Sequence, residues 1–237
     1  MQYRLSRVVA GPALRLLARP EITGTENIPK TGPAIVASNH LSVVDSIYLP
    51  LMLRRPLVFA AKSEYFTGTG AKDRLIAAYL RATNQLSTDR AGARAAQDML
   101  DAALDLLRSG ELFGIYPEGT RSPDGRLYRG RAGVGWLALN SGAPVIPVAM
   151  VGTARILPPG HSIPRPGRIS IRVGEPLTFS SIAGTGARQR RAVTDEVIQA
   201  IQKLSGQEYV PMYASARKDE LAAERAGGAG GAQRKAS

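Results

Sequence analysis

A histidine followed five residues later by an aspartate is the first arrangement in this 237-residue sequence that could do chemistry. His40 and Asp45 come directly after the apolar run Ala34–Ser38, which predicts a buried strand. Ligand sites in α/β sheets gather beyond the ends of strands. Five residues advance about 500° around a helix, so the two side chains meet only if a turn separates them. The carboxylate would then fix the imidazole tautomer and support the imidazolium formed on proton abstraction. The alternative is a capping histidine and an N-cap aspartate without a chemical role.

A second polar segment, Pro117-Glu118-Gly119-Thr120-Arg121, directly follows the apolar run Leu112–Tyr116. Residues of these types, packed this closely, make a loop whose backbone can approach a ligand and whose guanidinium is a strong phosphate donor. Three more arginines follow within ten residues, namely Arg126, Arg129 and Arg131. The alternative is a solvated basic loop.

Together, the two segments resemble the glycerolipid acyltransferase family, the lysophosphatidate (1-acylglycerol-3-phosphate) acyltransferases. Three further segments are similar to blocks of that family and occur in the family's order: Ala61–Phe66, Ser87–Arg90 and Val145–Val148. Tyr116 is a departure, because the family usually has Phe before Pro-Glu-Gly. The aromatic replacement does not threaten the chemistry.

The resemblance implies transfer of an acyl group from acyl-CoA or acyl carrier protein to the free sn-2 hydroxyl of a lysophosphatidate acceptor, which gives phosphatidic acid. It implies His40 as the base and Asp45 as the group that orients it. The implied substrate-binding residues are Arg90, Glu118, Gly119, Thr120 and Arg121, with Lys62 contacting the acceptor or CoA, or solvated. It implies no metal or other cofactor. The same blocks serve acceptors with other head groups, so a different lysophospholipid, glycerol 3-phosphate or a glycolipid remains an alternative acceptor.

Direct transfer, without an acyl-enzyme, agrees with two absences from the sequence. There is no cysteine, which excludes thiolate catalysis, disulfides and cysteine-zinc sites. There is no Gly-x-Ser-x-Gly elbow either, since the nearest match, Gly160–Pro164, ends in proline. His161 in that segment has no evident catalytic partner, so we interpret it as a loop residue.

The charge balance predicts an anionic partner. The chain has 31 basic and 19 acidic residues, a net charge of +12. Nucleic acid, an anionic membrane surface and phosphorylated small molecules all fit such a charge. Aromatic residues are only 5% and are not interleaved with the basic clusters, which argues against nucleic acid. A non-catalytic basic protein that binds anionic lipid remains the competing hypothesis.

Short apolar strands alternating with helices predict a single α/β domain, and the resemblance implies a mixed central sheet flanked by helices. We expect strands over 34–38, 57–60, 112–116, 145–150 and 168–173, and helices over 43–53, 73–81, 91–109 and 193–204.

Residues 132–154 carry no charge and are long enough to span a bilayer. Their internal Asn, Gly and Pro residues instead predict a helix, a turn and a buried strand. Gly133-Val134-Gly135 loosely fits a dinucleotide-binding pattern but follows a basic loop, so we interpret it as helix packing.

Three regions are expected along the chain. Residues 1–22 are basic and amphipathic and would lie in a membrane interface, or else pack their apolar side on the domain. Residues 23–213 would form the acyltransferase domain, and residues 214–237 a flexible tail rich in Ala and Gly. No segment is convincing as a membrane span, so we expect peripheral, monotopic attachment to the cytoplasmic face of the cell membrane.

Overall fold

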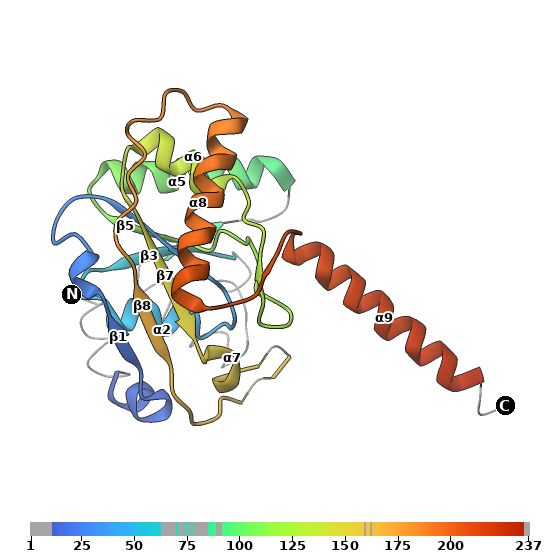
Figure 1. Ribbon diagram of the computed structural model, residues 1–237. Coiled ribbons are helices and arrows are strands. Elements are labelled where there is room, and N and C mark those ends of the chain that lie inside the picture. The colour runs from blue at the N-terminus through green and yellow to red at the C-terminus, as the bar shows by residue number, and fades with distance from the viewer. Residues whose placement is uncertain are drawn as a thin grey trace.

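The fold is built on a seven-stranded sheet with the strand order β1-β8-β7-β2-β5-β3-β4 (Figure 1). It is seen in a computed structural model that describes residues 11–62, 70, 74, 77, 85–88, 92–158, 160–161 and 163–234. The strands are β1 (Glu21–Thr23), β2 (Ala34–Ser38), β3 (Leu57–Lys62), β4 (Leu86–Thr88), β5 (Leu112–Ile115), β7 (Val145–Val151) and β8 (Ser170–Val173).

The sheet is mixed. The five strands from β7 to β4 run parallel to one another, while β8 pairs antiparallel with β7 and carries β1 parallel to itself. The two central strands, β2 and β5, are neighbours and point the same way. The segments that follow them, beginning at Asn39 and Tyr116, therefore start at the same edge of the sheet.

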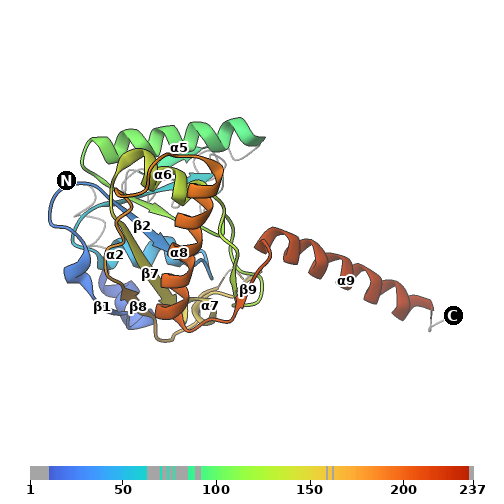
Figure 2. The same cartoon turned by 45° about the horizontal axis from the view of Figure 1, so that its top comes forward.

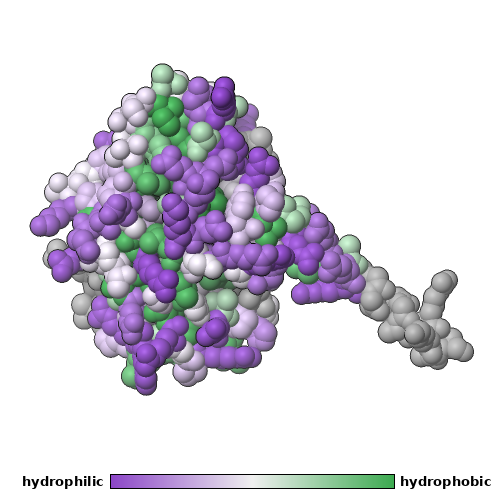
Figure 3. All heavy atoms as spheres, viewed as in Figure 1, coloured by the Kyte–Doolittle hydropathy of each residue, from purple (hydrophilic) through white to green (hydrophobic). Residues whose placement is uncertain are grey.

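Helices cover both faces of the sheet (Figures 1 and 2). On one face lies α2 (Asp45–Met52); on the other lie α5 (Gly92–Arg108), α6 (Gly133–Ser141) and α8 (Ala187–Ser205). The alternation along β2 explains this arrangement, because Val36 packs with α2 in one core cluster and Ile35 packs with the other three helices in a second. The outer surface of α8 is largely hydrophilic (Figure 3), as expected for a helix that buries one apolar stripe.

The helix formed by residues 11–18 packs on the α2 side of the sheet. Ala18 is fully buried there, and the Tyr48 hydroxyl donates to the Leu14 carbonyl over 2.8 Å. Leu16 points away from this contact and is 78% exposed. In the described part of the chain, every helix is too short or too polar to cross a bilayer.

The strands and helices predicted for the core agree with the structure. The uncharged stretch at 132–154 contains α6, a turn at Gly142 with a φ of +66°, and the buried strand β7. Gly133 and Gly135 lie in α6, and α6 packs against α8. The helix expected at 73–81 falls almost entirely outside the described residues.

Smaller elements escaped prediction. They are the edge strands β1 and β4, η1 (Thr25–Asn27), α7 (Thr153–Ile156) and the parallel pair β6 (Leu127–Tyr128) and β9 (Tyr209–Val210). The region boundary expected after residue 22 falls inside β1. The stretch expected to be a tail forms α9 (Ala214–Arg234), which projects from the body of the molecule (Figures 1 and 2).

Candidate active site

His40 and Asp45 meet at the carboxyl edge of the sheet. The chain turns directly after β2, and Asp45 is the first residue of α2. The His40 Nδ1 lies 2.9 Å from the Asp45 Oδ2. The same oxygen accepts hydrogen bonds from the backbone amides of Leu41 at 2.7 Å and Ser42 at 2.8 Å. The carboxylate therefore organises the turn as well as the imidazole.

These contacts determine the protonation pattern of the imidazole. Two amide donors already point at the Asp45 Oδ2, so this oxygen is an acceptor and the His40 Nδ1 carries the hydrogen. The His40 Nε2 then carries the lone pair that a general base needs. Asp45 is fully buried, while the His40 side chain retains 15% exposure. The pair can thus take a proton from a group that reaches the edge of the sheet.

A stack of three rings holds the imidazole plane. His40 stacks on Tyr116 with 3.8 Å between the ring centroids and 9° between the planes. Tyr116 in turn stacks on Phe59 of β3 at 4.9 Å. The Tyr116 hydroxyl lies 2.8 Å from the Ser46 hydroxyl in the first turn of α2. Sequence reasoning noted Tyr116 only as a departure and missed this role, because stacking depends on the neighbouring strands.

Glu118 lies beneath the site and joins its two loops. Its carboxylate accepts the amide hydrogens of His40 at 3.1 Å and Tyr128 at 3.0 Å, and the residue is only 1% exposed. The Ser122 amide donates back to the His40 carbonyl over 2.7 Å. The resemblance implied that Glu118 binds the substrate; in the structure each of its oxygens accepts a backbone amide hydrogen, one from His40 and one from Tyr128.

The pKa of the Glu118 carboxyl is raised from 4.5 to about 7. Burial is the main cause and the negative charge of Asp45 adds to it, while the two backbone amides and the Lys218 ammonium act in the opposite direction.

The segment after Glu118 forms the rim of the site. Gly119 has a φ of +74°, and a Cβ there would lie 2.8 Å from the Cδ of Arg131. The Thr120 hydroxyl accepts a hydrogen bond from Lys218 of α9 over 2.5 Å. Within the described residues no hydrogen bond or ion pair engages the Arg121 guanidinium, which is half-buried. The structure therefore brings Gly119, Thr120 and Arg121 to the same edge as His40.

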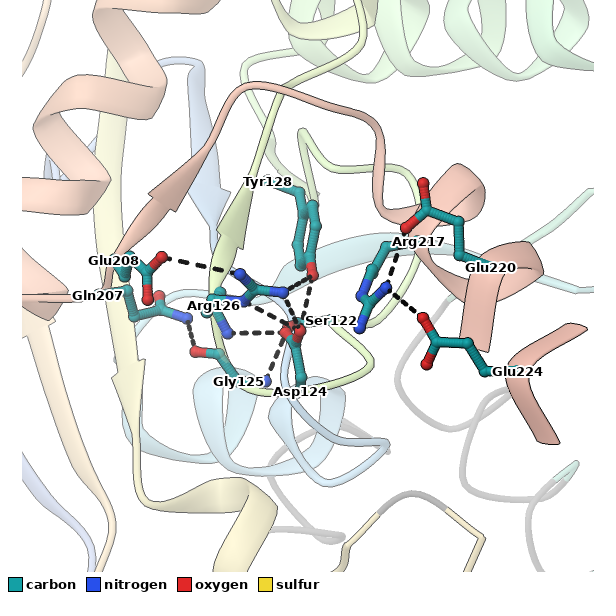
Figure 4. A network of polar contacts seen from close by, with 10 residues as sticks. All are labelled: Ser122, Asp124, Gly125, Arg126, Tyr128, Gln207, Glu208, Arg217, Glu220 and Glu224. Atoms are coloured by element: carbon teal, nitrogen blue, oxygen red, sulfur yellow. Dashed lines mark hydrogen bonds and ion pairs between the residues drawn. The ribbon is translucent and has the colours of Figure 1, made fainter. Parts of the chain in front are cut away.

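The other arginines near this loop have partners of their own. Arg126 pairs with Asp124 at 2.7 Å and lies 3.7 Å from Glu208, and Asp124 also accepts from the Tyr128 hydroxyl (Figure 4). Arg129 and Arg131 lie over the ring of Tyr213, at 5.6 and 5.1 Å from its centroid. Arg126 thus serves the loop structure and is a poor ligand for an incoming anion.

Asn39, which sequence reasoning also missed, fixes the strand edge on the other side of His40. Its side-chain amide exchanges hydrogen bonds with the backbone of Met150 in β7, at 3.0 and 2.7 Å, and also donates to Gln207 over 2.7 Å. Gln207 donates onward to the Gly125 carbonyl over 2.6 Å. An asparagine between Ser and His gave no signal of these long-range contacts.

Two predicted site residues lie wholly or partly outside what the structure describes. Arg90 is outside the described residues, as is the segment from Ser63 to Phe66. The backbone of Lys62 ends β3, next to β5, so it lies at the edge that carries the site; its side chain is outside the described part. His161 lies in a turn, where its amide donates to the Pro158 carbonyl over 3.1 Å.

The acyltransferase family model matches residues 19–151, which is more than half of the chain. The chain therefore belongs to the acyltransferase family. The matched region contains the His40–Asp45 pair, the Glu118–Arg121 loop and β7.

Solved and curated relatives agree with this membership. The chain is similar to the crystal structure of the 1-acyl-sn-glycerophosphate (LPA) acyltransferase PlsC from Thermotoga maritima, with a TM-score of 0.66 and 28% identity over 85% of this chain and 79% of that one. A 1-acyl-sn-glycerol-3-phosphate acyltransferase of Bacillus subtilis is 27% identical over 81% of this chain and 90% of its own. A chloroplastic enzyme of that name from Arabidopsis thaliana is 32% identical over 66% of this chain, but the match spans only 43% of its length.

Proposed function

We propose that this protein transfers an acyl group from a thioester, acyl-CoA or acyl carrier protein, to the sn-2 hydroxyl of 1-acylglycerol-3-phosphate, giving phosphatidic acid. The observation that carries the proposal is the buried Asp45 bound to the His40 Nδ1, which leaves the Nε2 lone pair for a substrate at the edge of the sheet that also carries Thr120 and Arg121. The names of the relatives support the choice of acceptor.

The chemistry follows from the two states of the imidazole. A hydroxyl is a poor nucleophile until a base takes its proton. As the acceptor oxygen attacks the thioester carbonyl, the His40 Nε2 takes that proton and the imidazolium is stabilised by the Asp45 carboxylate. The carbon–sulfur bond then breaks, and the imidazolium returns the proton to the leaving thiolate. The ester and the free thiol form without a covalent bond to the protein.

The acceptor is positioned through its phosphate. In the proposal the Arg121 guanidinium binds the phosphate in two-pronged fashion and so brings the hydroxyl to His40. Gly119 keeps the backbone free of a side chain at this rim, and Arg90 and Lys62 remain predicted ligands of the acceptor or of CoA.

Peripheral attachment to a membrane belongs to the same proposal, because the acceptor is a lipid. Leu16 and Ile163 are exposed apolar side chains, at 78% and 80%, on the helix of residues 11–18 and on the loop after α7. Exposed arginines flank both of them, which suits an anionic lipid surface. We place this surface at the cytoplasmic face of the cell membrane.

The test is release of CoA from oleoyl-CoA in the presence of lysophosphatidate. The protein has no cysteine, so a thiol reagent reports CoA alone. We expect His40→Ala to abolish release while the thermal midpoint and binding to lipid vesicles are retained. Full activity in His40→Ala would show that the base is assigned wrongly.

The +12 charge favours one second candidate, a lipid-binding protein without catalysis. A wild-type protein that binds anionic vesicles but is silent with every lysophospholipid tested would favour that alternative. In an active enzyme, Arg121→Ala should raise the KM for the acceptor far more than the KM for acyl-CoA. An equal rise in both would move Arg121 to the donor site.

A further inference from the structure

The first turn of α9 is fixed to the rim of the site. Tyr213, directly before the helix, lies under the guanidinium groups of Arg129 and Arg131. Arg131 also donates to the Ser215 hydroxyl over 3.1 Å, and Ala214 is fully buried. This end of α9 therefore has a defined position beside the loop that carries Arg121, although the rest of the helix leaves the body (Figure 1).

Lys218, one turn further along, reaches the rim itself. Its ammonium donates to the Thr120 hydroxyl over 2.5 Å, and the side chain is half-buried. Thr120 is the residue before Arg121, so two cationic groups converge on one short stretch of the loop. Burial lowers the pKa of Lys218, and the neighbouring positive charge of Arg121 lowers it as well, while the negative charge of Glu118 acts in the opposite direction.

Carboxylates form ion pairs with a neighbouring arginine of α9 but not with Lys218 or Arg121, among the described residues. Arg217, next to Lys218, pairs with Glu220 at 3.0 Å and Glu224 at 3.1 Å (Figure 4). Among the described residues neither Lys218 nor Arg121 has a carboxylate within ion-pair distance. The nearby Glu118 is committed to two backbone amides.

Two unneutralised cations beside a hydroxyl fit a phosphate group. The planar guanidinium binds phosphate oxygens in pairs, and the ammonium binds as a point charge. The Thr120 hydroxyl accepts from Lys218 through its oxygen and keeps its own hydrogen to donate. A phosphate between the two cations would attract both of them and so offset their mutual repulsion.

We propose that Lys218 binds the phosphate of the acceptor together with Arg121, so that α9 completes the acceptor site. This proposal rests on the proposed function, because it concerns the acceptor of the same reaction. It assigns a binding role to a segment outside the 19–151 match to the family model. Lys218 stabilises the bound acceptor and takes no part in proton transfer, so its loss should raise KM and leave kcat nearly unchanged.

The kinetic test compares Lys218→Met with Arg225→Met. Arg225 is exposed and lies seven positions further along α9, so the control removes the same charge from the same helix without touching the rim. We expect Lys218→Met to raise the KM for lysophosphatidate about 10- to 100-fold, the range of a lost hydrogen bond between charged groups. The KM for oleoyl-CoA and kcat should stay within twofold, Lys218→Arg should restore most of the affinity, and the control should match wild type.

A binding test separates this proposal from the proposed function. Glycerol 3-phosphate is titrated into the His40→Ala variant by calorimetry, with and without Lys218→Met. Weaker binding in the double variant supports the proposal even if no transferase activity is found. An unchanged acceptor KM, a rise in the oleoyl-CoA KM instead, or no binding of glycerol 3-phosphate before Lys218 is changed would overturn it.

Discussion

Asp45 combines two tasks that a substitution can separate. The backbone amides of Leu41 and Ser42 require an oxygen at the Oδ2 position. In Asp45→Asn the amide oxygen should therefore stay there, keep the turn and still accept from the His40 Nδ1. The variant loses the negative charge that stabilises the imidazolium, and we expect kcat to fall about 10²- to 10⁴-fold with little change in KM.

Steady-state kinetics and denaturation measured together check this separation. Asp45→Ala also removes the acceptor of both amides, so it should lower the free energy of unfolding as well as kcat. If Asp45→Asn keeps kcat within threefold of wild type, the carboxylate holds the turn and contributes nothing to proton transfer.

Glu118 should make stability depend on pH. Its folded-state pKa of about 7 exceeds the usual 4.5, so the folded protein holds this proton more tightly than the unfolded chain. The stabilisation is complete below about pH 4.5 and is lost as the pH rises through about 7. The loss amounts to about 3 kcal/mol, while Glu118→Gln cannot ionise.

Urea denaturation of wild type and Glu118→Gln from pH 4.5 to pH 8 measures this contribution. At pH 4.5 the two proteins should be about equally stable, because the protonated Glu118 and the glutamine each turn one donor, an OH or an NH₂, toward one of the two backbone amides. As the pH rises through about 7, the free energy of unfolding of the wild type should fall relative to that of the variant. A difference that is constant with pH would mean that Glu118 is ionised throughout this range.

The arrangement of the core elements could be predicted because the long central strands are recognisable in the sequence as buried segments. β2 and β7 are continuous apolar runs bounded by proline or polar residues, and they alternate with helices that bury one stripe. β1, β6 and β9 have two or three residues each, which is too short for any periodicity. Their pairing is fixed by the tertiary structure, so a boundary after residue 22 split β1.

The site could be predicted in part for a related reason. His40, Asp45 and Arg121 follow strands that the sequence reveals, and parallel neighbours bring their ends together. Lys218 lies 98 positions from Thr120, in a helix without an apolar face, so no local pattern indicated their contact. The inward role of Glu118 depends on the amide of Tyr128, which only the folded loop presents.

The Gly-x-Gly of α6 gives a matched test of helix packing. A Cβ on Gly135 would lie 2.2 Å from the Arg190 carbonyl oxygen of α8, whereas one on Gly133 meets its nearest atom, of Leu100, at 3.5 Å. Gly135→Ala should therefore push the helices apart and cost about 2 kcal/mol or more of unfolding free energy. Gly133→Ala should be neutral or stabilising by up to about 1 kcal/mol. Equal effects of the two in urea denaturation would contradict the close contact.

For the whole molecule, the distribution of charged and apolar groups suggests how it meets a lipid surface. The amides of Gly167 and Ile169 donate to the carbonyls of Leu17 and Ala18, each over 3.0 Å. This pairing holds the loop that contains Ile163 beside the helix of residues 11–18. Four exposed arginines lie on these two segments: Arg15, Arg19, Arg165 and Arg168. We call these two segments with their exposed side chains the lipid-facing surface.

The apolar and the electrostatic contributions to membrane binding can both be tested on the lipid-facing surface. Leu16→Glu with Ile163→Glu removes two exposed apolar side chains and adds two charges that anionic lipid repels, so cosedimentation with vesicles of phosphatidylglycerol and phosphatidylcholine should fall at least 10-fold. Ala96→Glu with Gln199→Glu adds the same charge on exposed positions of α5 and α8, across the sheet, and controls for net charge.

Binding of the wild-type protein to the vesicles should weaken as salt is raised. The screening length falls to about 10 Å at 0.1 M salt, so charges further apart than this attract each other only weakly. If the control pair reduces binding as strongly as the Leu16 and Ile163 pair, attraction depends on the overall charge of +12 and not on this surface. Activity with a soluble short-chain acceptor should be retained in all three proteins, because the Leu16 and Ile163 side chains are 78% and 80% exposed and the two control positions are exposed on α5 and α8.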